Sequence, residues 1–378
     1  MKKILTIIGA RPQIIKAAAF SRAISTKYSS ELTEVLVHTG QHYDENMSKI
    51  FFDELGIPAP NYQLAIGSDS HGSQTGKMLV EIEQILSKEQ PDGILVYGDT
   101  NSTIAGSLAA VKMHIPVIHV EAGLRSFNKK MPEEINRIAT DHFSTLLFSP
   151  TKAGVKNLAA EGFDVTASQG ASMNTPLVFH CGDIMYDNSM YFSKIADEKS
   201  SVLAQHDLTE NEYILSTVHR PSNTDKKENL KAILEGLLEI SETNKIKIVL
   251  PIHPRTQNKI SDLLSEEFYK KCQQRIAFIP PVSFLDMIKL EKCAQLIMTD
   301  SGGVQKEAYF FQKKCVILRE ETEWVEIVEE KAAICVGADK SKMISAYEEL
   351  MRSTCSFPSI FGNGAASEFI CEKILETV

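Results

Sequence analysis

Residues 4–20 read ILTIIGARPQIIKAAAF, and this stretch sets the pattern for most of the chain. An apolar run ends at Gly9, a turn follows, and Pro12 stands near the start of a helical segment, where a proline is well tolerated. A continuous apolar run is typical of a parallel strand that helices cover on both faces. The stretch therefore predicts a strand, a tight turn and a helix of a doubly wound α/β sheet.

The same alternation of strand and helix recurs in two blocks along the chain. In the first block the apolar runs lie at 4–9, 34–40, 93–99, 116–123 and 145–151. In the second block they lie at 213–219, 246–254, 276–281, 294–300, 315–320 and 332–337. We predict two Rossmann-like α/β domains with parallel sheets, at 1–172 and 173–364. A last helix, within 365–378, could pack back on the first domain or on the second.

The composition indicates a globular enzyme with two lobes. A chain of 378 residues exceeds one compact core, and 43% hydrophobic and 24% charged residues are ordinary values for a globular protein. The formal net charge of −9 disfavours a protein that mainly holds a nucleic-acid backbone, because that binding needs a surplus of Lys and Arg. We therefore expect no nucleic-acid partner.

Cysteine usage and the apolar runs predict a cytoplasmic protein. The seven cysteines are an odd number without a CxxC pair, which favours reduced thiols. The apolar run before Gly9 is too short for a signal peptide, and no run approaches the ~20 residues of a membrane span. We expect a cytoplasmic location and no contact with a membrane.

Ligands of open parallel sheets bind beyond the carboxyl ends of the strands, so the residues after each apolar run are site candidates. In GARPQIIKAA at 9–18, Arg11 and Lys16 accompany a helix start, which favours anion binding over the alternative that Arg11 only caps a surface. The spacing fits neither GxGxxG nor a P-loop. In GDTNST at 98–103, Asp99 directly follows a strand and is either a site carboxylate or a helix N-cap.

Two neighbouring segments, HVEAGLR at 119–125 and MPEEINR at 131–137, gather charges beside another strand end. Their acids and arginines are Glu121, Arg125, Glu133, Glu134 and Arg137. Desolvation and neighbouring charge push the pKa values of such carboxyls apart, which suits separate acid and base roles. Glu133 and Glu134 also suit the first turn of a helix, where an acid stabilises the helix dipole. We expect one of them to belong to the site and the other to stabilise the helix start.

The second domain has a segment that suits a nucleotide diphosphate, MTDSGGVQKEAYF at 298–310. Ser301, Gly302 and Gly303 stand at a helix start, where backbone N–H groups bind phosphate. Glu307 lies about one turn later and could accept hydrogen bonds from ribose hydroxyls. The second domain therefore looks built for a diphosphate, and the first offers carboxylates for proton transfer.

Histidines follow two further strands of the second domain, in STVHRPSNTD at 216–225 and PIHPRT at 251–256. A metal held by His219 and His253 is conceivable, but no third ligand lies at a recognisable spacing. We therefore predict no metal site.

With these residues assembled, the sequence resembles the UDP-N-acetylglucosamine 2-epimerase family along nearly its whole length. The matching segments are, in order, GARPQIIKAA, GQH, GDTNST, HVEAGLR, MPEEINR, HRPSNTD, HPRT and TDSGGVQKEA. The resemblance implies two Rossmann-like lobes of the glycosyltransferase-B type, with the active site in the interdomain cleft and UDP held mainly by the second lobe. It also implies a homodimer that uses a UDP-sugar and needs no cofactor.

The family begins its reaction by removing the proton at C2 of the sugar and eliminating UDP in the anti sense, which leaves 2-acetamidoglucal. Non-hydrolysing members add UDP back to give the C2 epimer, a precursor of bacterial surface polysaccharides. Hydrolysing members add water and release N-acetylmannosamine for the sialic acid pathway. The pair Pro12 and Gln13 favours the non-hydrolysing reaction here.

The resemblance also assigns roles to residues of this chain. The catalytic residues would be Asp99, Glu121, Glu133 and His219. The residues that bind the sugar nucleotide would be Arg11, Lys16, Arg137, Arg220, Asn223, His253, Ser301, Gly302, Gly303 and Glu307. Arginines beside the diphosphate would favour the transition state, because negative charge grows there as the C1–O bond breaks.

One departure from the family pattern bears on regulation. Members activated by their own substrate have a Met followed by a Gln three residues later, and an Arg before a QT pair. Here the residue three positions after Met47 is Ile50, and Ser73 precedes Gln74. This departure argues against allosteric activation by UDP-N-acetylglucosamine.

A second departure, TEWVE at 322–326, bears on the substrate. Trp324 and Val325 stand where much of the family has an arginine and a proline. The variant resembles a branch that includes 2-epimerases of UDP-2,3-diacetamido-uronic acids. A UDP-sugar glycosyltransferase of the same architecture is the more distant alternative.

Overall fold

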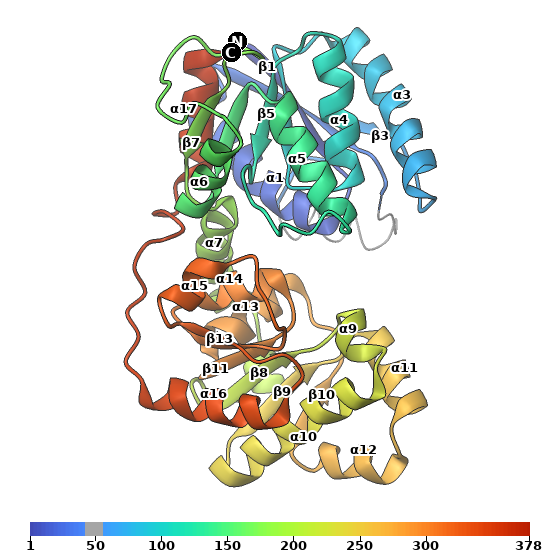
Figure 1. The fold of residues 1–378 in the computed structure, drawn as a ribbon, viewed down its shortest axis with the longest axis vertical. Coiled ribbons are helices and arrows are strands. Elements are labelled where there is room, and N and C mark those ends of the chain that lie inside the picture. Colours follow the sequence, from blue (N-terminus) through green and yellow to red (C-terminus); the bar gives the residue numbers. More distant parts are fainter. Residues whose placement is uncertain (42–55) are drawn as a thin grey trace. The chain divides into compact units, whose positions relative to one another are not determined.

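A computed structural model describes residues 1–41 and 56–378 of the chain (Figure 1). They form two compact units, each with its own parallel sheet. Unit 1 comprises Met1–Asn188 and Ser359–Val378, and unit 2 comprises Ser189–Pro358. Within the described residues, no helix combines the length and the apolar character needed to cross a membrane.

The strands of unit 1 form one sheet in which every pairing is parallel. They are β1 (Lys2–Ile8), β2 (Leu32–His38), β3 (Tyr62–Gln63), β4 (Gly93–Tyr97), β5 (Val117–Val120), β6 (Leu146–Ser149) and β7 (Leu177–His180). Their order is β3-β2-β1-β4-β5-β6-β7, so the direction of winding reverses between β1 and β4. Ligands of such sheets bind at this switch point, beyond the carboxyl ends of the strands.

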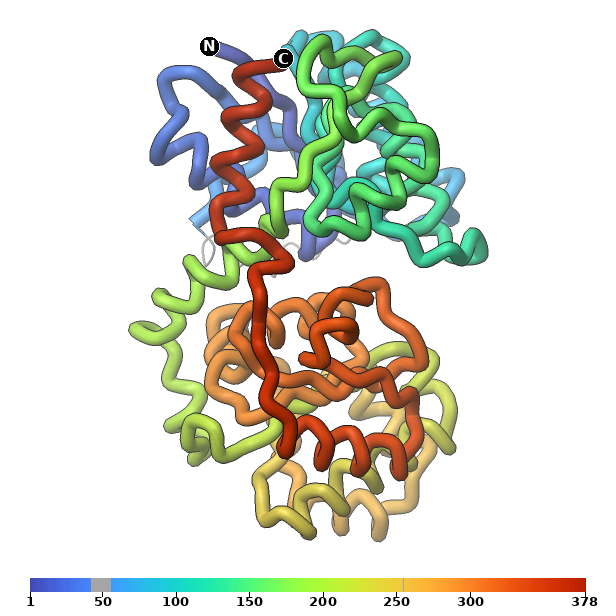
Figure 2. The backbone as a smooth tube through the Cα atoms, turned by 60° about the vertical axis from the view of Figure 1, so that its left-hand side comes forward, coloured from blue at the N-terminus to red at the C-terminus, as the bar shows by residue number. Residues whose placement is uncertain are grey.

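Helices cover both faces of the first sheet. They are α1 (Arg11–Ala23), the π-helical η1 (Ile24–Tyr28), α3 (His71–Glu89), α4 (Asn101–Lys112), α5 (Pro132–Phe143), α6 (Lys152–Ala160), the start of α7 (Ile184–Lys199) and α17 (Ala366–Thr377). Helices α3, α4 and α5 lie side by side (Figure 1). Met78 and Ile82 of α3 pack in one apolar cluster with Leu5 and Ile7 of β1. The C-terminal helix α17 packs against α1, so both chain ends belong to unit 1 (Figure 2).

Unit 2 repeats the architecture. Its strands are β8 (Tyr213–Thr217), β9 (Lys247–Pro251), β10 (Ile276–Ile279), β11 (Leu296–Thr299), β12 (Lys314–Ile317) and β13 (Ala333–Cys335). Their order is β10-β9-β8-β11-β12-β13, with the switch point between β8 and β11. The helices are α8 (Val202–Gln205), α9 (Pro221–Thr224), α10 (Lys227–Asn244), α11 (Pro254–Leu263), α12 (Glu266–Gln273), α13 (Phe284–Cys293), α14 (Gly302–Phe310), α15 (Val325–Glu329) and α16 (Lys340–Arg352).

The structure places the end of the first unit later than the sequence does. The short strand β7, which the sequence does not predict, pairs in parallel with β6 and extends the first sheet. Unit 1 therefore continues to Asn188, past the predicted boundary at residue 172. Likewise, β3 has only two residues and gives no recognisable apolar run.

Candidate active site

Gln13 joins the carboxyl ends of β1 and β4 at the switch point of the first sheet. Its side-chain oxygen accepts hydrogen bonds from the N–H groups of Gly9 at 2.9 Å and Ala10 at 3.2 Å. Its amide nitrogen donates to the Tyr97 carbonyl at 2.9 Å and to Thr103 Oγ1 at 3.0 Å. Because Gln13 is buried, these bonds fix both strand ends without competition from water.

Lys16 and Glu121 form an ion pair at the same edge, and both residues are buried. Lys16 lies in α1, and Glu121 directly follows β5. A Cβ atom on Gly98 would lie 3.2 Å from Glu121 Oε2 and 3.6 Å from Lys16 Nζ. Gly98 also has a φ of +61°, so a glycine both leaves room for the pair and permits this turn.

Glu121 adopts a left-handed backbone conformation with a φ of +73°. Such a conformation is uncommon for a residue with a side chain and is held only where the surroundings fix it. Here the N–H groups of Glu121 and Ala122 both donate to the Phe148 carbonyl of β6, each at 3.0 Å. The end of the neighbouring strand thus sets the direction in which the Glu121 backbone leaves the sheet.

Asp99, which follows β4, forms an ion pair with Arg137 of α5. Arg137 Nη1 also lies 2.6 Å from Glu134 Oε2. Burial raises the pKa of Asp99 and the charge of Glu121 raises it further, while Arg137 and Lys16 lower it without cancelling the rise. Asp99 is therefore a stronger base than an ordinary aspartate, which suits proton abstraction near neutral pH.

Glu133 and Glu134 occupy different environments at the start of α5. Glu134 is fully buried and accepts hydrogen bonds from the N–H groups of Ser126 at 2.9 Å and Phe127 at 2.8 Å. Glu134 therefore anchors the loop that precedes α5 and orients Arg137. Glu133 is exposed on the first turn of α5, and its predicted catalytic role stays a prediction.

In unit 2, Asp300 organises the turn that carries His219 and Arg220. This fully buried carboxylate accepts hydrogen bonds from the N–H groups of His219 at 3.1 Å and Arg220 at 3.0 Å. His219 Nδ1 lies 3.2 Å from Asp300 Oδ1. Burial lowers the pKa of His219, and the charges of Arg220 and His253 act in the same direction against Asp300. At neutral pH His219 is therefore mostly neutral until an anion binds beside it.

Two other predicted ligands support the backbone of unit 2. The buried Asn223 donates from Nδ2 to Asp300 Oδ2 at 3.0 Å and to the Leu318 carbonyl at 2.9 Å. His253 is the N-cap of α11, where Nδ1 accepts from the Arg255 N–H at 3.2 Å. Both residues hold turns at the carboxyl ends of strands, and their contact with a substrate stays a prediction.

The predicted phosphate cradle begins α14. Ser301 is the N-cap, and Gly302 and Gly303 form the first turn, so backbone N–H groups point away from the helix. A Cβ atom on Gly302 would collide with Glu323 Oε1. Burial acts to raise the pKa of Glu323, but Arg319, at 2.8 Å, and Arg220 hold it below its ordinary value. A carboxylate paired with Arg319 thus lies beside this helix start, and phosphate binding there stays a prediction.

Glu307, the predicted ribose ligand, lies near a second acid, Glu291 of α13. Burial first, and then the charge of Glu307, raise the pKa of Glu291 well above the ordinary glutamate value. Glu291 therefore holds its proton to higher pH than an ordinary glutamate does, and the contact of Glu307 with a ribose stays a prediction.

Two of the departures from the family pattern, at Trp324 and at Ser73, lie among the residues that the structure describes. Trp324 is buried, and the Nζ atom of the buried Lys306 lies 4.1 Å from its ring centroid, a cation–π contact. Ser73 donates to Asp69 in the first turns of α3. The comparison based on Met47 and Ile50 lies outside the described residues.

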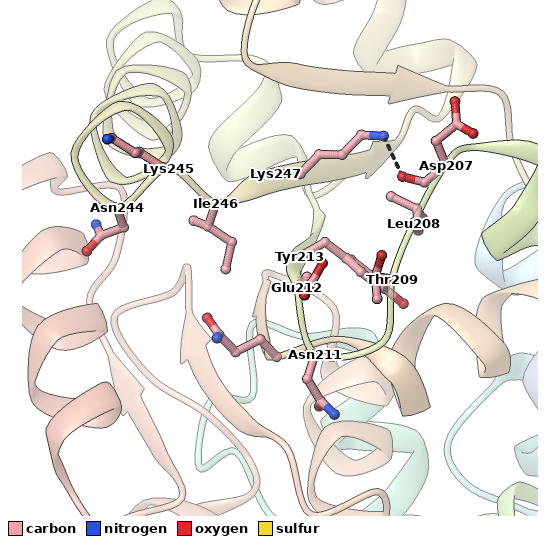
Figure 3. A pocket seen from close by; sticks show the side chains of 11 residues that line it. Asp207, Leu208, Thr209, Asn211, Glu212, Tyr213, Asn244, Lys245, Ile246 and Lys247 are labelled. Carbon is pink, nitrogen blue, oxygen red and sulfur yellow. Dashed lines mark hydrogen bonds between the residues drawn. The ribbon is translucent and has the colours of Figure 1, made fainter.

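A surface cavity of about 400 Å³ in unit 2 lies away from these residues (Figure 3). Tyr213 and Lys247 in its lining are the first residues of β8 and β9. Lys247 Nζ donates to the Asp207 carbonyl at 3.2 Å. The cavity is therefore at the amino ends of the strands, opposite the predicted phosphate cradle. Among the described residues, no three His, Cys, Asp or Glu side chains gather as a metal site would require.

Comparison with known proteins gives a family and close relatives. The family model described as UDP-N-acetylglucosamine 2-epimerase matches residues 25–375. A Methanococcus maripaludis protein named UDP-N-acetylglucosamine 2-epimerase homolog is 48% identical, over 98% of this chain and 99% of that protein. The Pseudomonas aeruginosa UDP-2,3-diacetamido-2,3-dideoxy-D-glucuronate 2-epimerase is 47% identical over the same shares.

Solved structures agree in fold. The Methanocaldococcus jannaschii UDP-GlcNAc 2-epimerase in complex with UDP-GlcNAc and UDP has a TM-score of 0.84 and 43% identity, and the match covers 99% of both chains. The Phytolacca americana UGT2 complexed with UDP-2fluoro-glucose and pterostilbene has a TM-score of 0.62 at 11% identity, over 99% of this chain and 94% of that one, which is a likeness of fold alone. These matches confirm the prediction of two Rossmann-like domains of the glycosyltransferase-B type.

Proposed function

The chain belongs to the UDP-N-acetylglucosamine 2-epimerase family, and we propose that it interconverts UDP-N-acetylglucosamine and UDP-N-acetylmannosamine. The observation that carries the proposal is the pair of carboxylates Asp99 and Glu121. They follow the neighbouring strands β4 and β5, and each is bound to a largely buried cation. Two carboxylates in unlike surroundings are what proton removal and proton return at one carbon require.

The reaction begins with transfer of the C2 proton to a carboxylate of unit 1. The electron pair of the C2–H bond becomes the C1=C2 double bond, and the C1–O bond breaks with its electron pair leaving on UDP. Addition of UDP to C1 and delivery of a proton to the other face of C2 complete the epimerisation. We assign the proton transfers to Asp99 and Glu121, with Glu133 as the further acid that the resemblance implies.

The leaving diphosphate gains negative charge as the C1–O bond breaks, so donors that face it lower the barrier. We assign this role to Arg11, Arg137 and His219. The neutral His219 beside Arg220 would gain a proton as the dianionic diphosphate approaches. The first turn of α14 binds phosphate, Glu307 binds the ribose, and Lys16 assists on the unit 1 side, where it pairs with Glu121. His253 and Asn223 complete the nucleotide side of the site.

A second candidate substrate is a UDP-2,3-diacetamido-uronic acid. It is favoured by the 47% identical relative that bears this name and by Trp324 in place of the common arginine. The two substrates differ at C3 and C6 and share the reacting C1 and C2 atoms. The same carboxylates therefore serve either reaction, and only the sugar contacts differ.

The deciding experiment is incubation of the purified protein with UDP-N-acetylglucosamine in deuterium oxide, followed by proton NMR. We expect deuterium at C2 and accumulation of UDP-N-acetylmannosamine. Free N-acetylmannosamine with UDP would identify the hydrolysing reaction. Unlabelled, unchanged UDP-N-acetylglucosamine alongside turnover of the uronic acid would establish the second candidate. No exchange with either compound would refute an epimerase.

The predicted assembly and location also remain proposals. We propose a cytoplasmic homodimer, as the family resemblance implies, with a role in surface polysaccharide precursors. Light scattering of the purified protein gives its mass, and the value expected for a dimer is twice the 42.0 kDa of one chain. A mass of one chain at working concentration would contradict the homodimer.

A further inference from the structure

His119 lies in a buried cluster of ionisable side chains next to the turns that carry Asp99 and Glu121. It is in β5, two residues before Glu121, and is fully buried. Its Nε2 atom lies 2.8 Å from the Gly98 carbonyl oxygen, and its Nδ1 atom lies 2.7 Å from Asp141 Oδ1 of α5. Gly98 in turn is the residue directly before Asp99.

Both ring nitrogens of His119 contact buried acceptors. The Gly98 carbonyl has no hydrogen to give, so Nε2 must carry one. Asp141 Oδ2 already accepts from the Gly123 N–H at 3.1 Å and pairs with Arg125 at 2.7 Å. Burial would raise the pKa of Asp141, but the charges of His119 and Arg125 lower it overall. Asp141 is therefore a carboxylate, and its contact with Nδ1 holds the imidazole ring between the turn after β4 and helix α5.

We propose, on the basis of the function proposed above, that the buried ring of His119 is a positioning residue for both Asp99 and Glu121. Its ring ties the turn after β4 to α5, while its own strand leads directly into Glu121. Both Gly98 and Glu121 have left-handed backbones, with φ of +61° and +73°. Glycine adopts this conformation freely, whereas that of Glu121 persists only where neighbouring bonds hold it.

The charged groups around His119 keep this arrangement in place. Asp141 faces it from α5, and Arg125 binds both Asp141 and Glu161, the latter through Nε and Nη2 at 2.7 Å each. Above Gly98 lie Lys16 and Glu121, which pair with each other. Since His119 and Asp141 have no exposed surface, bulk solvent cannot replace either bond.

The proposal predicts a specific kinetic pattern for His119→Gln. Because the Gly98–Asp99 turn loses its anchor, kcat should fall roughly 10- to 100-fold, as misplaced catalytic groups do. UDP affinity, which the proposed function assigns mainly to unit 2, should stay within about twofold of wild type. Asp141→Asn keeps the hydrogen bond to Gly98 but removes the compensating charge, so it should lower kcat less than His119→Gln. His114→Gln, at an exposed site before the same strand, is the matched control.

Proton–nitrogen-15 NMR of the wild-type protein, with its ten histidines labelled, tests the ring contact to Gly98 directly. We expect one histidine whose Nε2 hydrogen is protected from exchange with solvent, because it is buried against the Gly98 carbonyl, and whose signal disappears in His119→Gln. Absence of such a protected hydrogen, or a folded His119→Gln with wild-type kcat, would overturn the proposal. Deuterium exchange at C2 by wild type, measured in parallel, separates this failure from failure of the proposed function.

Discussion

At the scale of single residues, Asp99 and Glu121 are controlled by different neighbours. Arg137 of α5 pairs with Asp99, whereas Lys16 of α1 pairs with Glu121. Burial dominates the pKa of Asp99, which stays raised although Arg137 and Lys16 oppose it. Two acids at one strand edge can therefore differ in basicity, as a proton removal and a proton return require.

Replacement of Asp99 or Glu121 by its amide should abolish most of the turnover and leave UDP binding intact. We expect Asp99→Asn and Glu121→Gln to lower kcat by roughly 100- to 10,000-fold, because a positioned acid or base contributes about that much. UDP binding, measured by calorimetry, should change by less than about threefold. Glu81→Gln, at an exposed position of α3, is the control. Loss of UDP affinity in step with kcat would mean that these acids are structural.

The pH dependence of activity should report the pKa of Asp99. In the proposed reaction Asp99 accepts the C2 proton and must be deprotonated to do so, so kcat/KM should fall as the pH drops below its raised pKa. In Arg137→Gln the positive charge that lowers this pKa is gone. The acid limb of the kcat/KM profile should therefore move to higher pH. Arg352→Gln, on the exposed face of α16, should leave the limb in place, and an unmoved limb in Arg137→Gln would count against Asp99 as the base.

Substitutions of Glu133 and Glu134 should differ in how much they lower the free energy of unfolding of unit 1. Glu134→Gln weakens the hold on the Ser126 and Phe127 N–H groups and on Arg137, so we expect unit 1 to lose about 1–3 kcal/mol. Glu133→Gln, at an exposed position, should change stability by less than about 0.5 kcal/mol. Urea unfolding followed by circular dichroism measures both. A loss of kcat in Glu133→Gln at full stability would support its catalytic role.

At the scale of elements, the ends of β1, β4 and β5 are tied by side chains rather than by the sheet alone. Gln13 connects the start of α1 to the Tyr97 carbonyl and Thr103. In unit 2, Asp300 does the same for the turn after β8, and Asn223 links it to β12 through the Leu318 carbonyl. Each switch point therefore has one buried polar residue that fixes the loops around it.

Gln13→Ala should destabilise unit 1 by about 2 kcal/mol or more, since it leaves buried N–H and carbonyl groups without their partner. Gln84→Ala, on the exposed side of α3, should cost no more than about 0.5 kcal/mol. The single tryptophan, Trp324, belongs to unit 2, so its fluorescence follows that unit alone. A change confined to the circular dichroism transition locates the loss in unit 1, and equal stability of the two variants would contradict the role given to Gln13.

At the scale of the whole molecule, the two units differ in chain continuity. Unit 2 is one continuous segment, whereas unit 1 is completed by the last residues of the chain. Ile370, Cys371 and Ile374 of α17 are fully buried. Each sheet therefore has its strands in one stretch, but unit 1 also depends on a helix that follows unit 2 in the sequence.

A chain that ends at Pro358 should retain unit 2 and weaken unit 1. Loss of α17 exposes the apolar surface that Ile370 and Ile374 cover, worth several kcal/mol by area. We expect the circular dichroism transition of unit 1 to fall in temperature while the Trp324 fluorescence transition and UDP binding persist. Glu376→Gln in the full chain should change neither. Loss of the fluorescence transition would show that unit 2 does not fold alone.

The sequence by itself determined the repeated α/β pattern, the two parallel sheets and the family. Continuous apolar runs and glycine turns are local signals, so β1, β4, β8 and β11 are predictable. The motifs at the strand ends make Asp99, Glu121 and Ser301 site candidates for the same reason. The short strands β3 and β7 were not predictable, because two to four residues give no periodicity and pairing with a distant strand defines them.

Only the tertiary structure decided which charged residues are buried and which groups they pair with. Glu133 and Glu134 are neighbours in sequence, yet the turn of α5 exposes the first and buries the second against Arg137. His119 and Asp141 lie 22 positions apart, and nothing local marks them as partners. Burial and charge pairing depend on atoms from several elements at once, so a local pattern names the candidates and three-dimensional packing sets their chemistry.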